Sequence, residues 1–229
     1  MKITLNVFMC VRNNEDSLRT TFDVFEKCEE KGWKLRYYIY ENDSTDDTVA
    51  IVRVFMKNKN GNISVNNVKN KVQWKSIVDI NRIEDMVYYR NEMLNLCSNK
   101  TIMDYTAIID TNIIFSFEDL ENLIQTLYYD KYISCCTPFS ISSNGRYYDT
   151  YALRSEKGEK CIPITLGNMI YVKSAFGGIC VVRSEKLEGF QYTMPSVKDD
   201  NEHMSFCEWM SKHGKIVINK KVSCLWKQD

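Results

Sequence analysis

The 229-residue sequence has few of the residues that interrupt regular structure, with only three prolines and nine glycines. That scarcity excludes collagen-like, linker-rich and intrinsically disordered chains. Thirty basic residues balance thirty acidic ones. A net charge of zero argues against a general nucleic-acid binder and against a protein held on a membrane by charge. No run of about 18 apolar residues is present, so we expect no transmembrane segment.

The nine cysteines include no C-x-x-C pair. An odd number of cysteines leaves one thiol outside any set of disulfides, and no spacing matches a zinc site. We therefore expect free, mostly buried thiols in a reducing compartment. Since the first residues also lack the pattern of a signal peptide, the sequence predicts a cytoplasmic protein.

Hydrophobic residues make up 44% of the chain, which is enough to fill one core. We expect a single domain over 1–229. Its first half alternates between strand patterns and helix patterns, with strands at 1–11, 34–41, 62–66 and 105–110 and helices at 14–31, 46–57, 82–98 and 117–128. This alternation predicts an α/β fold, in which helices flank a central sheet that is mixed but mainly parallel.

The second half is predicted to contain more strands than helices. The expected elements are strands at 132–139 and 146–153 around a turn at 143–145, strand-like runs within 162–183, a helix at 200–212 and a strand at 215–224.

Polar side chains follow three of the predicted strands, at the point where each strand ends. Arg12 follows the first strand, Glu41 and Asp43 follow the second, and Asp110 and Asn112 follow the buried strand at 105–110. The carboxyl ends of parallel strands share one edge of the sheet, which is where such sheets bind ligands. The simpler alternative is that these residues form turns and helix caps, as Asn, Asp and Ser commonly do.

One of these strand ends and an arginine on a predicted helix could take part in phosphate binding. Asp110 and Asn112 offer oxygen ligands suited to a Mg²⁺ or Mn²⁺ ion that bridges two phosphates. Arg90, on the helix predicted at 82–98, could reach a phosphate or pair with the acidic loop. The alternatives are a turn after a buried strand and an ordinary surface ion pair.

The second half adds two candidate groups. Glu202 and His203 are adjacent in a chain with only two histidines, and could supply a carboxylate near a reacting carbon and a metal ligand. Acidic residues also favour the first turn of a helix, and a single histidine is often structural. Asp149, beside aromatic residues, could bind sugar hydroxyls.

In order along the chain, the acidic loop at 41–48, the arginine helix and the Asp-x-Asn strand end resemble the nucleotide-sugar glycosyltransferases with a GT-A fold, over about 1–125. The segments 146–154, 176–183 and 202–207 are similar to the fungal capsule-associated mannosyltransferase family. They are also similar to the N-terminal glycosyltransferase domain encoded by large chloroviruses. This resemblance, with the Asn- and Lys-rich composition, suggests a viral or microbial enzyme, which would lie in the host cytoplasm if the source is a virus.

The resemblance implies a nucleotide-binding half, 1–125, and a half for the acceptor and the transferred sugar, 126–229. The donor would be a nucleoside-diphosphate sugar, with a UDP-sugar favoured, and the acceptor a glycan or another hydroxyl compound. The donor would contact Val11, Arg12, Glu41, Asp43, Arg90, Asp110 and Thr111. Mn²⁺ or Mg²⁺ would be held by Asp110, Asn112 and His203, although Asn112 replaces the second acid of the family pattern. Glu202 and Asp149 would be the catalytic candidates.

Two other functions remain open on the sequence. A sugar-phosphate nucleotidyltransferase should carry a glycine-rich basic loop after the first strand to bind a triphosphate, but residues 11–15 contain no glycine. A degenerate module could bind nucleotide or glycan without turnover, and Asn112 is the feature that favours this reading.

Overall fold

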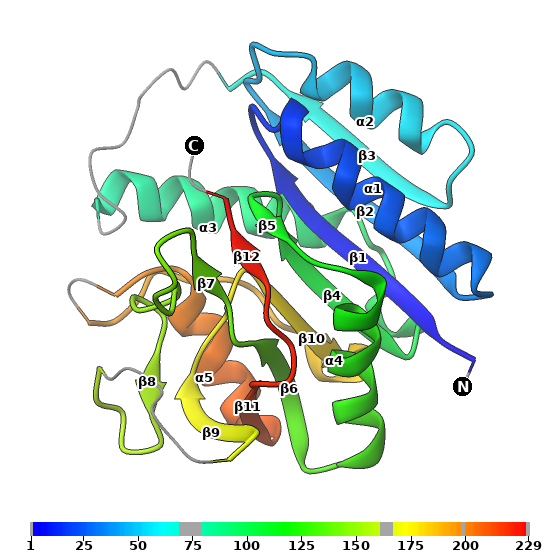
Figure 1. Ribbon diagram of the computed structural model, residues 1–229. Helices are drawn as coiled ribbons and strands as arrows, with labels where there is room; N and C mark the ends of the chain where they lie inside the picture. Colours follow the sequence, from blue (N-terminus) through cyan, green and yellow to red (C-terminus); the bar gives the residue numbers. More distant parts are fainter. Residues whose placement is uncertain (1, 69–78, 161–166, 198–199, 228–229) are drawn as a thin grey trace.

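The computed structural model describes residues 2–68, 79–160, 167–197 and 200–227. Within these residues a nine-stranded sheet forms the centre of the molecule, in the order β3-β2-β1-β4-β10-β6-β11-β9-β8 (Figure 1). Its strands are β1 (Thr4–Val11), β2 (Lys34–Asn42), β3 (Gly61–Asn66), β4 (Tyr105–Asp110), β6 (Ile133–Pro138), β8 (Arg154–Ser155), β9 (Met169–Ser174), β10 (Ile179–Arg183) and β11 (Lys215–Asn219).

One half of the sheet is parallel. Strands β3, β2, β1 and β4 pair in parallel, because helices α1 (Glu15–Glu30), α2 (Thr48–Met56) and α3 (Ile80–Asn95) return the chain across the sheet between them. Strand β10 is antiparallel to both β4 and β6, whereas β11 is parallel to β6. The predicted α/β class, with a mixed and mainly parallel sheet, is confirmed.

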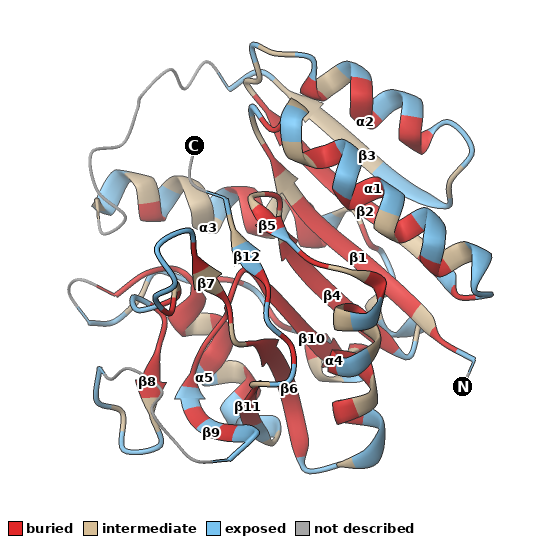
Figure 2. Ribbon diagram, in the orientation of Figure 1, coloured by how far each residue is buried: buried red, intermediate tan, exposed pale blue. Residues whose placement is uncertain are grey.

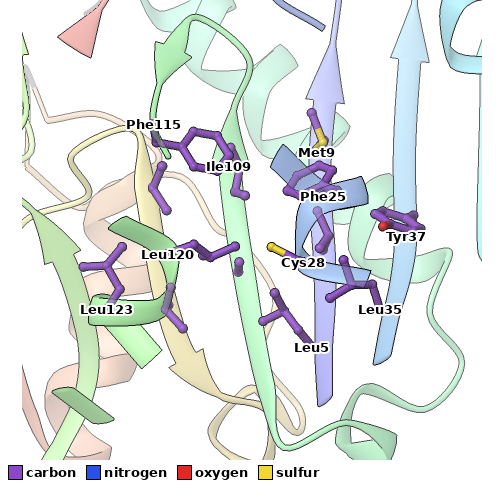
Figure 3. Close-up of a cluster of buried hydrophobic side chains, with 14 of the residues drawn as sticks. Leu5, Met9, Phe25, Cys28, Leu35, Tyr37, Ile109, Phe115, Leu120 and Leu123 are labelled. Atoms are coloured by element: carbon purple, nitrogen blue, oxygen red, sulfur yellow. The ribbon is translucent and has the colours of Figure 1, made fainter. Parts of the chain in front are cut away.

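Hydrophobic cores cover both faces of the sheet. Alternate residues of β1 face opposite sides: Leu5 and Met9 join the core under α1, α2 and α4 (Phe117–Tyr129), while Phe8 joins the core under α3 and α5 (His203–His213). Figure 2 shows the buried central strands between helices whose outer faces are exposed. Figure 3 shows the first core, where Phe25 and Leu120 point toward the strands from two different helices.

A second, smaller sheet closes one side of the molecule. Strands β5 (Ile113–Ile114), β12 (Leu225–Trp226) and β7 (Ile141–Ser142) pair in the order β5-β12-β7. The last described strand thus lies between residues that immediately follow β4 and residues that follow β6 (Figure 1). Two short 3₁₀ helices, η1 (Lys100–Ile102) and η2 (Ser184–Leu187), complete the elements.

Several predicted boundaries are wrong. The strand expected at 146–153 is absent: this part of the chain folds into turns, with the Tyr148 N–H bonded to the Ser140 carbonyl, and β8 begins only at Arg154. Helix α2 begins at Thr48 rather than at residue 46, because the Asp46 carboxylate accepts a hydrogen bond from the Thr48 N–H. The last predicted strand, 215–224, ends at Asn219. The positions 162–166 of another predicted segment lie outside the described residues.

The described part of the chain contains eight cysteines, all of them free thiols. In the same residues, no helix is both long enough and apolar enough to cross a lipid bilayer.

Candidate active site

A cavity of about 300 Å³ opens at the carboxyl ends of the parallel strands. Its wall combines residues from β1, β2 and β4 with residues from α3, from the start of α5 and from the small sheet. The lining residues are Cys10, Val11, Arg12, Asn14, Asn42, Arg82, Met86, Tyr89, Arg90, Asp110, Thr111, Asn112, Tyr148, Asp149, Phe176, Gly178, Asn201, Glu202, His203 and Trp226.

Asn14 fixes the loops that follow β1 and β4. Its Oδ1 accepts hydrogen bonds from the Arg12 N–H (3.0 Å) and the Thr111 hydroxyl (2.5 Å), and its Nδ2 donates to Asn112 Oδ1 at 2.6 Å. Its own backbone N–H donates to the Thr48 hydroxyl. The side chain and backbone of this one buried residue therefore hold together three segments at the sheet edge: the loop after β1, the loop after β4 and the start of α2.

Arg90 is the centre of the charged part of the site. Its side chain is 3% exposed, yet its guanidinium donates to Asp110 Oδ1 at 3.1 Å and to Glu202 Oε1 at 3.2 Å. The guanidinium also lies over the Phe176 ring, at 5.3 Å from the ring centre. A buried charge of this kind requires partners, and here β4 and the start of α5 supply them.

The same guanidinium determines the state of His203. Arg90 Nη2 lies 3.1 Å from His203 Nε2, and because a guanidinium only donates, Nε2 must accept and the ring proton must sit on Nδ1. Burial, reinforced by Arg90, lowers the pKa of His203 to about 3. The ring is therefore neutral at pH 7, and it stacks on Phe176 with 3.8 Å between ring centres.

The pKa values of Glu202 and Asp110 are shifted in opposite directions by their surroundings. Burial opposes ionisation of Glu202, but positive charge around it holds its pKa below the ordinary value: that of His203 whenever its ring is protonated, and at every pH that of Arg90 and of Arg82, whose Nη1 lies 3.8 Å from Glu202 Oε2. Burial raises the pKa of Asp110, Arg90 opposes that rise, and the Glu202 charge adds to it. Glu202 is thus a permanent anion at the cavity wall.

Asp149 has both carboxylate oxygens engaged by backbone. Oδ2 accepts from the N–H groups of Phe176 (2.7 Å) and Gly177 (2.8 Å), and Oδ1 accepts from Ala152 at 3.4 Å. Burial raises the pKa of Asp149 to about 6, although these three hydrogen bonds oppose the rise. The carboxylate fixes the turn before β10, where Gly177 has a φ of +67°, and this geometry fits a positioning residue better than a sugar ligand.

The predicted site residues are only partly brought together. Nine of them line the one cavity: Val11, Arg12, Arg90, Asp110, Thr111, Asn112, Asp149, Glu202 and His203. Glu41 and Asp43 are not among its lining residues. The Glu41 side chain is buried, and its Oε1 accepts the Ser44 N–H at 2.9 Å. Asp43, with a φ of +54°, forms the turn that begins this loop.

The acidic loop after β2 mainly connects loops to one another. Asn13 Oδ1 accepts the Thr45 N–H, Asp46 Oδ2 accepts the Glu15 N–H, and Glu15 Oε2 accepts the Asp47 N–H. The simpler reading of this motif, as a turn, accounts for these contacts.

The predicted metal ligands fit a cation unequally. Asn112 Oδ1 already accepts from Asn14, and His203 Nε2 accepts from Arg90. Asp110 keeps a partly exposed side chain at the cavity wall. No group of three or more His, Cys, Asp or Glu side chains in the described ranges could hold a metal ion. Asp110 alone fits as a ligand, and the other ligands of a cation would have to come from a bound substrate and water.

Sequence reasoning missed several residues of the cavity. One face of α3 lines the cavity with Arg82, Met86, Tyr89 and Arg90, which are successively four, three and one residues apart. Because this is the spacing of one helix face, the periodicity could have identified Arg82. For Asn14 the sequence indicates only the first position of the helix expected at 14–31. For Tyr148 and Trp226 the sequence carried no signal, because they meet through the small sheet.

The comparisons with known proteins identify the family and the fold. The family model described as Cryptococcal mannosyltransferase 1 matches residues 35–214, well over half of the sequence. The chain belongs to this family. Among functionally curated proteins, none matches the sequence.

Solved structures share the fold at low sequence identity. Glucosyl-3-phosphoglycerate synthase from Mycobacterium tuberculosis, in complex with Mg²⁺ and UDP, has a TM-score of 0.59 and 14% identity over 99% of this chain and 72% of its own. TarS from S. aureus has a TM-score of 0.62 and 16% sequence identity, over 100% of this chain and 37% of its own. The mannosyltransferase PcManGT from Pyrobaculum calidifontis, in complex with GDP-Man and Mn²⁺, has a TM-score of 0.52 and 11% sequence identity, over 98% of this chain and 57% of its own. The family member described here therefore has the GT-A fold of nucleotide-sugar glycosyltransferases.

Replacing Asp149 by Asn should destabilise the protein, because the new amide N–H₂ must face at least one backbone N–H that the carboxylate now accepts. An unsatisfied buried donor costs about 1–3 kcal/mol, and each kcal/mol lowers the melting temperature by about 2–4 °C for a chain of this size. Calorimetry at pH 8, with the exposed Asp23→Asn as control, measures the effect. A melting temperature equal to that of the control would show that these hydrogen bonds contribute nothing.

Acid should destabilise the protein through His203. Its folded pKa of about 3 lies below the unfolded value of 6.5, so the unfolded chain binds the extra proton and stability falls as pH drops from 6.5 toward 3. His203→Gln should flatten this fall, by up to about 1.4 kcal/mol per pH unit. Urea unfolding across that range measures the slope, with His213→Gln as the matched control. Equal slopes for His203→Gln and wild type would refute the neutral buried imidazole.

Proposed function

We propose that this protein is a glycosyltransferase that moves a sugar from a nucleoside-diphosphate sugar to a hydroxyl group of a glycan or a similar acceptor. The observation that carries the proposal is the buried Arg90, held between Asp110 and Glu202 at the carboxyl edge of the parallel strands. Membership of a mannosyltransferase family supports the same function, as do neighbours solved with UDP and with GDP-Man.

The donor would lie across the strand ends. Val11, Arg12 and Asn42 end β1 and β2 and would face the nucleoside, for which we favour uridine. Asp43, beside Asn42, keeps its predicted role toward the ribose as a proposal. The diphosphate would lie over β4, where Arg90 and Thr111 line the wall. Its two negative charges would be met by guanidinium groups already in place, at little reorganisation cost.

We propose Mn²⁺ or Mg²⁺ as the cofactor, bound jointly by the Asp110 carboxylate and the donor diphosphate. Magnesium in such sites is commonly held by one or two carboxylates together with substrate phosphates. The bound ion would offset the charge that develops on the leaving diphosphate. Because Asp110 is the one carboxylate among the predicted ligands in the described part of the chain, this arrangement makes cation affinity depend on the nucleotide.

Glu202 is the proposed catalytic carboxylate. With its pKa held below the ordinary value by Arg90 and Arg82, it accepts a proton poorly at pH 7, since an effective general base titrates near the working pH. Its permanent charge is suited to stabilising the positive charge that develops on the sugar ring as the bond to the diphosphate breaks. Arg90 and Arg82 hold Glu202 in place for that role. Asp149, with no free oxygen in this structure, is proposed to position Phe176 and Gly177.

A non-catalytic binding module is the second candidate. Asn112 favours it, because an amide stands where the family pattern has an acid, and this amide is bound to Asn14. Hydrolysis or transfer of a UDP-sugar would exclude the module, while tight UDP binding without turnover on any donor or acceptor would favour it. A nucleotidyltransferase should instead act on a sugar phosphate with a nucleoside triphosphate.

Asp110→Asn should abolish the gain in UDP affinity that Mn²⁺ provides, because the variant keeps the shape of the side chain and loses the charge. Calorimetric titration of UDP with and without Mn²⁺ measures this gain, which we expect to be about tenfold or more in wild type, equal to 1.4 kcal/mol. Asp23→Asn serves as the matched control. The cation proposal fails if Asp110→Asn retains the full Mn²⁺ effect.

Glu202→Gln should lower turnover by about 10²-fold or more, the usual scale for an electrostatic group acting on a transition state. Donor KM should change much less, since the amide keeps the volume and an oxygen for Arg90. Initial rates of UDP-sugar hydrolysis across a set of donors provide both constants. Unchanged turnover would remove Glu202 from the chemistry.

A further inference from the structure

Two aromatic rings from distant parts of the chain stack at the cavity wall. Tyr148 and Trp226 have ring centres 3.9 Å apart and planes only 11° apart, and both line the cavity. Both are half-buried, although large aromatic side chains of the core are fully covered. The proposed chemistry of Arg90, Asp110 and Glu202 does not use this pair.

The sheet order places the pair opposite the nucleoside end of the cavity. The Tyr148 N–H donates to the Ser140 carbonyl at 2.9 Å, and the Ser140 hydroxyl donates to the Gly177 carbonyl at 2.5 Å. Tyr148 is thus fixed beside the end of β6 and the turn before β10. Strands β10 and β6 lie on one side of β4, whereas β1 and β2, which carry Val11 and Asn42, lie on the other. The pair is therefore separated from the nucleoside end by the strand that carries Asp110.

Trp226 is held there by two unrelated segments. It is the second residue of β12, which pairs with β5 on one side and β7 on the other, and it packs against the core under α1 and α4. Its neighbour Leu225 is 39% exposed, so this strand lies at the surface beside the cavity mouth. Burial raises the pKa of the Tyr148 phenol, and the carboxylates of Asp110 and Asp149 add to the rise. The stacked pair of Tyr148 and Trp226 thus reaches from the surface to the charged part of the site around Asp110.

We propose that Tyr148 and Trp226 form the acceptor subsite, in which a pyranose ring of the acceptor stacks with its C–H face on an outward ring face of the pair, since the facing sides of the two rings cover each other. An aromatic face is electron-rich and attracts the weakly positive C–H groups of a sugar ring. A nucleotide base could also stack on an aromatic ring, but the base belongs at the β1–β2 end. This inference rests on the proposed function, and it narrows the acceptor from any hydroxyl compound to a glycan that ends in a pyranose.

Ligand-observed NMR with a panel of methyl pyranosides, in the presence of UDP, tests the subsite directly. Sorbitol, an acyclic polyol, is the matched probe, because it has the hydroxyl groups of a sugar without a ring face. At least one pyranoside should bind wild type, and sorbitol should not. Trp226→Ala should weaken that binding about tenfold, the effect of losing an aromatic contact, while Trp226→Phe should stay within about threefold of wild type.

Two controls separate the subsite from a role in folding alone. Calorimetric UDP affinity should stay within about twofold in every variant, which reports an intact nucleotide end. Tyr151→Ala, an exposed aromatic of the same segment that does not line the cavity, should bind the pyranoside as wild type does.

Four results are decisive. Wild type that binds UDP but no pyranoside would overturn the acceptor subsite and leave the proposed function standing. Equal pyranoside affinity in Trp226→Ala and wild type would overturn it as well, as would loss of UDP affinity in Trp226→Ala, which would assign the ring to the donor or to the fold. Failure of wild type to bind UDP would instead overturn the proposed function.

Discussion

One buried cation organises the charged part of this molecule. Arg90 joins β4, through Asp110, to the start of α5, through Glu202, and it sets the tautomer of His203. Each of these groups would be costly to bury alone, and each is acceptable because the guanidinium is present. The same contacts keep Arg90 and Glu202 charged at the cavity wall. These are the charge states that their proposed roles require, which are binding of a diphosphate and stabilisation of a cationic sugar.

The carboxyl edge of the sheet is rigid for a second reason. Asn14 connects the loops after β1 and β4, the acidic loop after β2 connects to the start of α1, and Asp149 holds the turn before β10. The segment before α5 is tied down by the ion pair of Arg154 with Asp200. Polar side chains at these strand ends therefore build the scaffold, and a smaller set faces the cavity. A preorganised site of this kind can stabilise charge without first rearranging.

The sequence predicted the class of fold and much of the site. Alternating strands and helices indicated the parallel half correctly, and strand ends located Arg12, Asp110 and Asn112 at one cavity. The sequence alone could not distinguish the two purposes that acidic residues serve at these strand ends. Glu41 is as acidic as Asp110, but its carboxylate turns back to the Ser44 N–H, and no local pattern distinguishes the two. Tyr148 and Trp226 meet through strands of two residues, which are too short for any periodicity to reveal.

The central claim is that a nucleoside diphosphate binds with its phosphates beside the ion pair of Arg90 and Asp110. A crystal structure of the protein with UDP and Mn²⁺ measures this most directly, because the anomalous signal of manganese locates the ion independently of the nucleotide. The account predicts diphosphate density beside Arg90 and a manganese peak within coordination distance of Asp110. Nucleotide density at another surface, with Arg90 and Asp110 still paired in an empty cavity, would contradict it.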